Sequence, residues 1–354
     1  MTYRVIQWAT GSVGKAAIEA VLAHPELELV GCWVHSAAKD GRDVGELIGI
    51  DPIGVPACAD ADAVLAIEAD CVVYAPLVPD PREVEAILRS GKNVVTPVGW
   101  FYQAPRDAPL DAAARDCGVT LHGTGINPGG ITELFPLMIS SLTSAVTFVR
   151  GEEFSDIRSY GAPDVVRHIM MFGGTPEEAL GGPMLGLLSG GFKQSLRMLI
   201  DELGFDPSAE IRTSQQVAVA TAPIDSPIGV IEPGLVAAQR FQWDAVIGET
   251  VVARVAVNWL MGEENLDPDW SLGAAGERFE VEVQGDPSAF VTIKCWQPET
   301  VEEGLVRNPG IVATAVHCVN SIPYVVRAEP GMKSYLDLPL IAGRARRELS
   351  RLSS

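Results

Sequence analysis

The chain has 354 residues, of which 47% are hydrophobic and 20% are charged, a composition typical of folded globular proteins and not of disordered or fibrous ones. Its formal net charge of −20 argues against a protein that wraps nucleic acid or lies on an anionic membrane. The length suffices for two domains, each with a core of its own.

The first 35 residues predict a βαβ unit. An aromatic and β-branched run at 3–8 leads into the turn Ala9-Thr10-Gly11-Ser12-Val13-Gly14, then helix-forming residues at 15–23 and a second apolar run at 28–34. In such a unit glycines keep Cβ atoms away from a pyrophosphate, and the helix N-terminus offers free N–H groups. We expect these six turn residues to bind a dinucleotide, an ordinary strand-to-helix turn being the alternative.

Ala9 stands where the dinucleotide fingerprint has its first glycine. Alanine lacks glycine's freedom to adopt positive φ, so we expect Ala9 to keep a negative φ.

Basic and hydroxyl side chains follow the second strand, where NAD-preferring units usually carry an acidic residue for the ribose 2′-OH. Here His35 and Ser36 take that place, and Lys39 and Arg42 come close behind. A hydroxyl and two cations suit a 2′-phosphate better than a diol. NADP(H) is therefore favoured as the cofactor, with NAD(H) as an alternative. The segment can also be an ordinary solvent-exposed loop that is basic without binding a cofactor.

Helices and short apolar strands then alternate. Helices are expected at 62–70, 80–90 and 107–117, and strands at 71–75, 93–96 and 119–122. This alternation predicts an α/β domain with an open, doubly wound parallel sheet. Ligands of such sheets bind beyond the carboxyl ends of the strands, so Ala75 and Pro76 are expected beside the nicotinamide part of the cofactor.

The pattern changes after the glycine-rich turn 123–130. A helix at 131–142 is expected first, followed by longer, alternating strands typical of a mainly antiparallel open sheet. The strands are expected at 146–154, 211–221, 235–246, 250–259, 278–283 and 290–296, with helices at 163–172 and 184–203. In the fourth strand Val251, Ala253, Val255 and Val257 are expected to share one face.

This pattern predicts that the chain is divided into three segments. They are a dinucleotide-binding domain at 1–140, an α+β substrate and dimerisation domain at 141–305, and a C-terminal segment at 306–354. The apolar helix at 309–321 is expected to return to the first domain and to leave a cleft between the two domains.

The six cysteines are scattered without a CxxC pair, which favours a reduced protein and gives no zinc-ligand spacing. The first strand begins almost at Met1, so no signal peptide is expected. The longest apolar stretch, 311–326, is interrupted by His317, Asn320 and Pro323 and does not read as a membrane span. We expect a cytoplasmic protein without a metal site.

The chain resembles the dihydrodipicolinate reductase-like oxidoreductases, and within them the branch of 2,4-diaminopentanoate dehydrogenase and the native amine dehydrogenases. The resemblance rests on QWATGSVG at 7–14, the segment 35–46 and GTGINPG at 123–129, and covers residues 1–135 well and the rest in layout. It implies a Rossmann domain, a mixed α/β substrate domain and a homodimer. The turn at 96–99 resembles the loop near the nicotinamide, which implies cofactor contacts from Thr96, Pro97 and Val98. Asn127 is expected to organise the turn at 123–129 beside the cofactor by bonding to its backbone, with substrate contact as the alternative.

Two departures from the family narrow the chemistry. The basic His-His segment of true dihydrodipicolinate reductases is absent, which disfavours lysine biosynthesis. The amine dehydrogenase branch is expected to carry a catalytic glutamate after its fourth major strand, where this chain has Val98-Gly99-Trp100-Phe101. Amine or imine chemistry then needs another proton donor, whereas hydride transfer is unaffected.

Three residues are candidates for the missing donor. Tyr102 offers a phenol, or is one more aromatic wall residue. His122 is expected at a strand end that faces the cleft, or is structural. Glu153 or Asp156 is a candidate to hold a substrate amine, the alternative being a solvated strand end. Both belong to a polar cluster at the start of the second domain, formed by Glu152, Glu153, Asp156, Arg158 and Tyr160. Glu133 is expected only to cap the helix at 131–142 or to complement its dipole.

Trp100 and Phe101 are expected to make the pocket wall apolar and to favour a hydrophobic carbonyl or imine compound. The sequence thus predicts an NAD(P)-dependent oxidoreductase that transfers a hydride to or from a C=O or C=N group of a small, largely apolar molecule. The alternative is a catalytically silent NADP(H)-binding sensor or scaffold.

Overall fold

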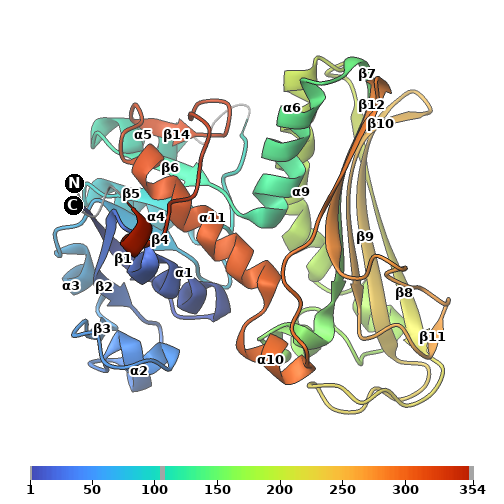
Figure 1. The fold of residues 1–354 in the computed structure, drawn as a ribbon, viewed down its shortest axis with the longest axis horizontal. Coiled ribbons are helices and arrows are strands. Elements are labelled where there is room, and N and C mark those ends of the chain that lie inside the picture. Colours follow the sequence, from blue (N-terminus) through green and yellow to red (C-terminus); the bar gives the residue numbers. More distant parts are fainter. Residues whose placement is uncertain (1, 104–107, 351–354) are drawn as a thin grey trace. The chain divides into compact units, whose positions relative to one another are not determined.

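A computed structural model describes residues 2–103 and 108–350 as two compact units (Figure 1). The first unit comprises Met1–Gly129 and Ile311–Ser354, and the second comprises Gly130–Gly310. The sequence-based boundaries are 140/141 and 305/306, whereas the units divide at 129/130 and 310/311. Each unit is described by itself.

The first unit contains a seven-stranded sheet in which every pair of neighbouring strands is parallel. Its strand order is β14-β6-β5-β4-β1-β2-β3. The strands are β1 (Tyr3–Trp8), β2 (Leu27–Trp33), β3 (Ala57–Cys58), β4 (Cys71–Tyr74), β5 (Asn93–Thr96), β6 (Thr120–Gly123) and β14 (Gly331–Lys333). Every residue of β4, β5 and β6 is buried, as both faces of a parallel sheet are when helices cover them. The predicted doubly wound sheet is confirmed.

Helices cover both faces of this sheet. They are α1 (Ser12–Ala23), α2 (Val44–Ile48), α3 (Ala61–Leu65), α4 (Pro81–Arg89), α5 (Ala108–Asp116) and α11 (Pro309–Val325). The apolar residues of α4 and α5 pack against Ile6, Val72, Val94 and Leu121, which share one face of the strands. In Figure 1, α1 and α11 lie in front of the sheet. The first residue of the helix predicted at 107–117 lies outside the described residues.

The helix predicted at 62–70 is shorter than expected. Asp60 caps its start by accepting the N–H groups of Asp62 and Ala63, but α3 ends at Leu65. Asp70 is held in place by Arg4, whose N–H donates to Asp70 Oδ2 at 2.6 Å while the Asp70 N–H donates to the carbonyl of Arg4. Because this pairing fixes the approach to β4, tertiary structure overrides the helical propensity of residues 66–70.

The second unit contains another seven-stranded sheet, of order β11-β8-β9-β10-β7-β12-β13. Its strands are β7 (Ser144–Asp156), β8 (Glu210–Ala220), β9 (Val236–Ile247), β10 (Thr250–Leu260), β11 (Leu266–Asp267), β12 (Arg278–Asp286) and β13 (Ala289–Ile293). All pairs are antiparallel except β7 with β10, which run parallel. The mainly antiparallel sheet is confirmed, and the parallel pair at its centre was not foreseen.

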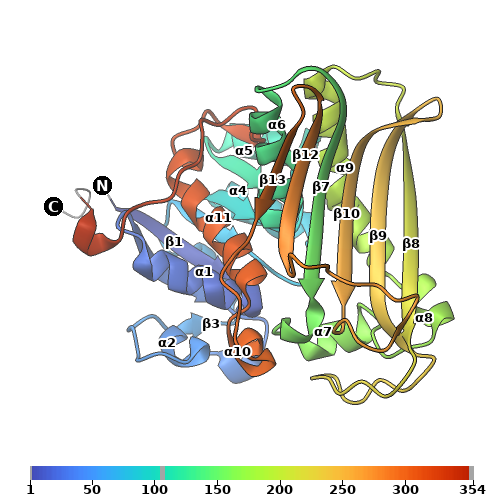
Figure 2. The same cartoon turned by 45° about the vertical axis from the view of Figure 1, so that its right-hand side comes forward.

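One face of this sheet is covered by helices, as the edge-on view in Figure 1 and the turned view in Figure 2 show for α6 and α9. The helices of this unit are α6 (Phe135–Ser140), α7 (Pro163–His168), α8 (Pro176–Leu180), α9 (Met184–Leu203) and α10 (Val301–Val306). Phe192, Leu196 and Leu199 of α9 pack on Phe241 and Trp243 of β9.

Two expectations for the second unit need correction. A register shift between Val251 and Ala253 interrupts the alternation of β10, so Val252 joins Ala253, Val255 and Val257 in the core. The helix predicted at 163–172 ends at His168, and Met171 has φ of 62°, a conformation that no helix accommodates.

Candidate functional site

The turn between β1 and α1 is built for close approach of a ligand to the backbone. Gly11 is the N-cap residue of α1; no side chain caps the helix there, and a Cβ at Gly11 would have no neighbour within 4 Å. Gly14 lies against the turn, because a Cβ there would be 2.2 Å from the carbonyl oxygen of Ala9. A helix start without a side-chain cap, beside open space, fits the diphosphate of a dinucleotide.

Ala9 adopts φ of 73°, so the expectation of a negative φ is wrong. The left-handed conformation persists because neighbouring groups fix the turn. Gln7 Nε2 donates to the carbonyl oxygens of Ala9 at 2.9 Å and Trp8 at 3.2 Å, and the Ala9 N–H donates to the carbonyl of Trp33 at 3.0 Å. Ala9 therefore has the backbone of the fingerprint glycine at the cost of strain.

The basic segment after β2 reaches this turn. Lys39 Nζ donates to Thr10 Oγ1 at 2.9 Å, which brings its charge to the glycine-rich residues, while His35, Ser36 and Arg42 are exposed. Two acids of the same segment accept backbone N–H groups. Asp40 accepts the N–H of Ala59 at 2.8 Å. Asp43 accepts three backbone N–H groups, chiefly that of Ile53, which lower the pKa of its carboxyl.

The expected cofactor residues at the ends of β4 and β5 lie at neighbouring strand ends. The Ala75 N–H donates to the carbonyl of Trp8 at 3.1 Å, which ties the end of β4 to the end of β1. Thr96 is fully buried, and its hydroxyl accepts the N–H of Val98 at 3.2 Å. Pro76, Pro97, Val98, Ser12, Val13 and Asn127 are partly exposed. These positions form the carboxyl-end edge where parallel sheets bind ligands.

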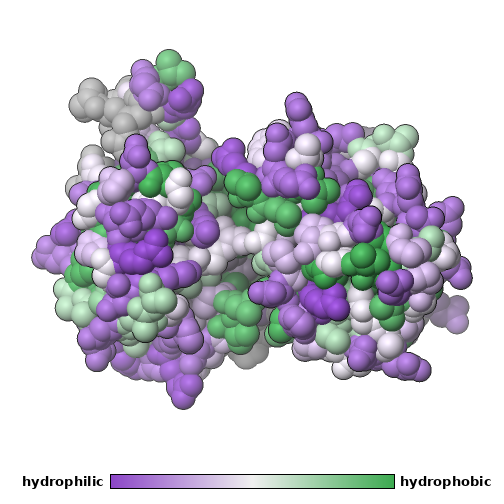
Figure 3. Space-filling view, turned by 90° about the horizontal axis from the view of Figure 1, so that it is seen from below, coloured by the Kyte–Doolittle hydropathy of each residue, from purple (hydrophilic) through white to green (hydrophobic). Residues whose placement is uncertain are grey.

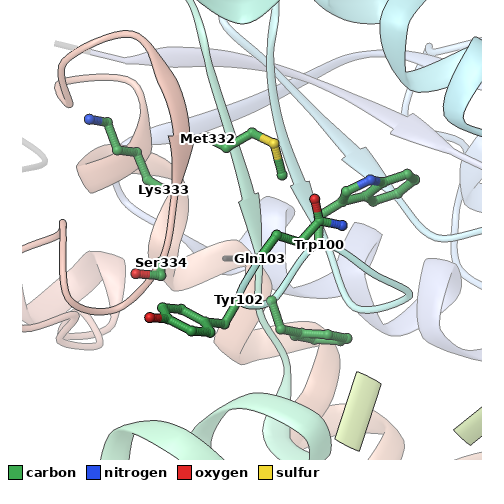
Figure 4. Close-up of a pocket in the computed structure, with 7 residues that line it drawn as sticks. Trp100, Tyr102, Gln103, Met332, Lys333 and Ser334 are labelled. Atoms are coloured by element: carbon green, nitrogen blue, oxygen red, sulfur yellow. The ribbon is translucent and has the colours of Figure 1, made fainter. Parts of the chain in front are cut away.

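A cavity of about 270 Å³ lies beyond β5 and β14 in the first unit. Its lining residues are Trp100, Phe101, Tyr102, Gln103, Met332, Lys333 and Ser334. In Figure 4 the Tyr102 phenol extends towards Ser334, and the Lys333 ammonium points away from the aromatic residues. Trp100 and Phe101 are almost fully buried and form the apolar part of the wall. The cavity is also lined by the polar residues Gln103, Lys333 and Ser334, which the sequence did not predict.

His122 is fully buried in β6 and holds the C-terminal strand in place. Its Nδ1 lies 2.8 Å from the carbonyl oxygen of Lys333. A carbonyl only accepts, so Nδ1 carries the proton in this contact. Burial lowers the pKa of His122 to about 4, which keeps the ring neutral at physiological pH. This environment favours a structural role over proton donation.

The sequence did not predict a hydrogen-bonded group of three side chains next to the end of β6. Tyr335 Oη lies 2.5 Å from Thr124 Oγ1 and 2.7 Å from His317 Nε2. Burial lowers the pKa of His317 to about 4. The three residues come from the end of β6, from α11 and from the segment after β14, and no local sequence pattern relates them.

Glu153 lies on β7, partly exposed in the second unit. Its Oε1 accepts the indole N–H of Trp259 and the hydroxyl of Ser155, both at 2.9 Å. Within the cluster expected around it, Asp156 pairs with Arg158 at 2.5 Å. Glu152 instead pairs with Arg150, so it lies on the opposite face of the strand.

Glu133 does not have the role that its sequence position suggested. Its side chain is fully buried, and its Oε1 accepts the Ser195 hydroxyl at 2.7 Å instead of capping a helix. Burial raises the pKa of Glu133 to about 8, and the Ser195 bond opposes this rise only in part. A raised pKa of this kind is common among groups that move protons.

Residues 2–103 and 108–350 contain no cluster of three or more His, Cys, Asp or Glu side chains able to hold a metal ion. Within the same residues no helix is long and apolar enough to cross a membrane. On the face seen in Figure 3, hydrophilic and intermediate residues predominate and hydrophobic ones form small groups.

Two family models match the chain, one in its N-terminal part and one in the part that begins with the second unit. The N-terminal model of dihydrodipicolinate reductase matches residues 5–79, and the C-terminal domain model of 2,4-diaminopentanoate dehydrogenase matches residues 131–349, more than half of the chain. The chain belongs to the 2,4-diaminopentanoate dehydrogenase family. The resemblance inferred from its motifs is thereby confirmed, and the protein is an NAD(P)-dependent oxidoreductase that acts on a small molecule.

Individual relatives agree with this assignment. An amine dehydrogenase of Streptomyces virginiae is 34% identical over 358 residues, covering 95% of this chain and 96% of the relative. A 2,4-diaminopentanoate dehydrogenase of Acetoanaerobium sticklandii is 28% identical over 256 residues, covering 72% of this chain and 66% of the relative. The solved amine dehydrogenase of Mycobacterium smegmatis has the same fold, with a TM-score of 0.76, 23% identity, and coverage of 97% of this chain and 98% of that one.

Proposed function

We propose that this member of the 2,4-diaminopentanoate dehydrogenase family is an amine dehydrogenase. It interconverts a small, largely apolar carbonyl compound plus ammonia with the corresponding amine, through a C=N group. The observation that carries the proposal is 34% identity, over nearly the whole of both chains, to a protein named amine dehydrogenase.

The residues of the first unit fit a nicotinamide dinucleotide. The N–H groups at Gly11 and at the start of α1 would hold the diphosphate, with Ala9, Thr10, Ser12, Val13 and Gly14 shaping the turn. Ala75, Pro76, Thr96, Pro97, Val98 and Asn127 would border the nicotinamide. The bound cofactor supplies or accepts the hydride. Trp100 and Phe101, both buried, keep water from that side of the sheet.

NADP(H) is the proposed preference within the nicotinamide cofactors. Lys39 already reaches the phosphate-binding turn through Thr10, and Ser36 and Arg42 are exposed close by. Both carboxylate oxygens of Asp43 accept backbone N–H groups, and Asp40 Oδ1 accepts one. Two cations and a hydroxyl in this segment favour a 2′-phosphate.

Among the donors proposed from the sequence, Tyr102 and Glu153 keep accessible side chains. Tyr102 lines the cavity beyond β5, where its phenol would position a substrate polar group. Glu153 carries a carboxylate suited to an ammonium group. For His122 we propose a positioning role, because its ring is buried and bonded to the backbone of β14.

The proposal is tested by titrating the protein with NADPH and NADH and then assaying a panel of ketones and aldehydes with and without ammonia. Turnover that requires both ammonia and an apolar carbonyl compound is the expected result, with oxidation of the matching amine in the reverse direction. Turnover of the carbonyl compound without ammonia would replace the proposal by an alcohol dehydrogenase. Cofactor binding without any turnover would revive the sensor alternative, which the comparisons do not support.

We also propose that the protein acts as a homodimer, an expectation that rests on family likeness. Light scattering coupled to size-exclusion chromatography tests it directly, and a monomer mass overturns it.

A further inference from the structure

The cavity beyond β5 and β14 is apolar on one side and cationic on the other. All of its lining residues belong to the first unit. In Figure 4 the Trp100 ring lies on one side and the Lys333 side chain on the other, while the Tyr102 phenol extends towards Ser334 between them. A ligand that fits this cavity therefore has an apolar body and one polar end.

Lys333 is fixed through its backbone and not through its side chain. It is the last residue of β14, it pairs with His122 of β6, and its carbonyl oxygen lies 2.8 Å from His122 Nδ1. The next residue, Ser334, is also fixed, because its N–H and its hydroxyl both donate to Asp337 Oδ2 at 2.9 Å. Within residues 2–103 and 108–350, the Lys333 ammonium has no ion-pair or hydrogen-bond partner.

This unpaired ammonium stands out in an acidic protein. The chain has 46 Asp and Glu residues against 26 Lys and Arg residues, so acids are available to pair with most cations. Lys333 is only partly exposed, and a partly buried charge without a partner loses hydration without gaining an ion pair. An anion bound in the cavity would provide the missing partner through a charge-assisted hydrogen bond.

The lining also selects the class of anion. One ammonium matches one negative charge, whereas phosphate sites usually combine several donors. The volume of about 270 Å³ lies just below the range of ordinary small-molecule sites, which excludes a nucleotide. Trp100, Phe101 and Met332 are buried and offer apolar contacts. These features fit a small carboxylic acid with an aromatic ring or a branched alkyl chain.

We propose that the cavity binds a small apolar monocarboxylate, whose ring or alkyl chain lies against Trp100 and Met332 and whose carboxylate pairs with Lys333. The four-carbon stem of Lys333 is flexible and lets the ammonium turn towards the cavity. Three strands separate β14 from β1, so at about 4.8 Å per strand the site lies roughly 19 Å across the sheet from the diphosphate-binding turn. The proposal does not depend on the amine dehydrogenase activity, because binding is measured without turnover.

Calorimetric titration of the full chain with phenylacetate and with phenylacetamide tests the site. The two probes have nearly the same shape, and only the acid is charged at neutral pH. We expect phenylacetate to bind at least about tenfold more tightly than the amide. Cyclohexanecarboxylate and isovalerate, each with its amide, extend the comparison to alkyl groups.

Variants of Lys333 assign the binding to its charge. Lys333→Met keeps an unbranched side chain without charge and should lower the affinity for phenylacetate to that for the amide, whereas Lys333→Arg should retain tight binding. Both should melt like wild type, because the ammonium has no partner in the part of the fold that the structure describes. The matched control is Lys294→Met, which removes an exposed lysine of the second unit and should bind phenylacetate as wild type does.

Equal affinities for acid and amide, or phenylacetate binding that Lys333→Met leaves unchanged, overturn the proposal. Lys333 would then only protect an edge strand from pairing with other chains. A lack of saturable binding for all three acids overturns it as well. Wild-type protein that binds these acids but turns over no carbonyl compound overturns the proposed function alone.

Inhibition kinetics distinguish two sources of the carboxylate. If phenylacetate raises the KM for the carbonyl compound at constant kcat, the carboxylate belongs to the substrate itself. If it changes kcat at constant KM, the ligand is a separate small molecule.

Discussion

The carbonyl oxygen of Ala9 lies 2.2 Å from the position that a Cβ on Gly14 would occupy. No side chain fits there without moving the turn. At Gly11, in contrast, a Cβ would meet nothing within 4 Å. The two glycines therefore serve different purposes: Gly14 allows the protein to pack against itself, and Gly11 leaves space for a ligand.

This difference predicts distinct effects of alanine at the two positions. Gly14→Ala should destabilise the first unit by about 1–3 kcal/mol through overpacking and weaken cofactor binding with it. Gly11→Ala should melt like wild type yet bind NADPH at least about tenfold more weakly, a loss of about 1.4 kcal/mol. Melting curves and fluorescence titrations of both variants check the prediction. Equal cofactor affinity in Gly11→Ala and wild type would contradict the placement of the diphosphate.

Ala9→Gly should stabilise the protein modestly. A left-handed conformation costs a residue with a Cβ about 1–2 kcal/mol, and glycine removes that cost. Glycine also gains about 0.4–1 kcal/mol of freedom in the unfolded chain, which offsets part of the benefit. The net expectation is a gain of about 0.5–1 kcal/mol in the free energy of unfolding, measured by urea denaturation. A loss of stability would show that Ala9 is unstrained.

The cofactor preference can be reversed in part by removing the cations after β2. Lys39→Ala and Arg42→Ala should each raise the Kd for NADPH by about tenfold or more, as expected for a charge-assisted bond worth about 1.5–3 kcal/mol. The Kd for NADH should change much less, because NADH lacks the 2′-phosphate. Calorimetric titration of each variant with both nucleotides provides the comparison. Equal losses for the two nucleotides would mean that these side chains contact the shared diphosphate instead.

The two buried histidines predict acid sensitivity. Burial lowers the pKa of His122 and of His317 from 6.5 to about 4, so the folded state favours the neutral ring. Stability is therefore fully present above pH 6.5 and is lost as the pH falls towards 4, by about 2 kcal/mol for each histidine at pH 5. Among the groups facing His122, Asp337 raises its pKa and so opposes the loss of stability in acid, whereas His317 lowers its pKa and so adds to that loss.

His317→Gln tests that expectation while retaining a partner for Tyr335. The stability difference between variant and wild type should shift in favour of the variant by about 2 kcal/mol between pH 7 and pH 5. Comparing differences is necessary because Glu133, with its raised pKa, gains stability as the pH falls over the same range. A difference that does not depend on pH would place the His317 ring in contact with solvent.

Local signals in the sequence predicted the first unit well. Asp80 accepts the N–H of Arg82, Pro81 begins α4 and Gly91 follows it with φ of 78°, as the capping pattern indicates. The glycine-rich turn also lies where its bracketing strand and helix placed it. Such features depend on neighbours in the chain, which a sequence displays directly.

Features that depend on distant contacts could not be predicted. Arg4 fixes Asp70 just before β4, and Tyr335 joins Thr124 to His317 across more than half of the chain. The position of Glu133 in the sequence predicts a helix cap, and only the fold reveals that its side chain is buried and bonded to Ser195. Burial and long-range partners decide the chemistry of a carboxyl group, and neither is visible in local patterns.

The first unit takes its last strand from the other end of the chain. β14 pairs with β6, and the Met332 N–H donates to Asp111 Oδ1 at 2.8 Å, although these partners are separated by the whole second unit. A ribosome therefore synthesises residues 130–310 before it makes the strand that closes the edge of the first sheet. We expect the second unit to reach its native state first during synthesis, and the dinucleotide-binding unit, although begun earliest, to be the last part of the newborn chain to finish folding.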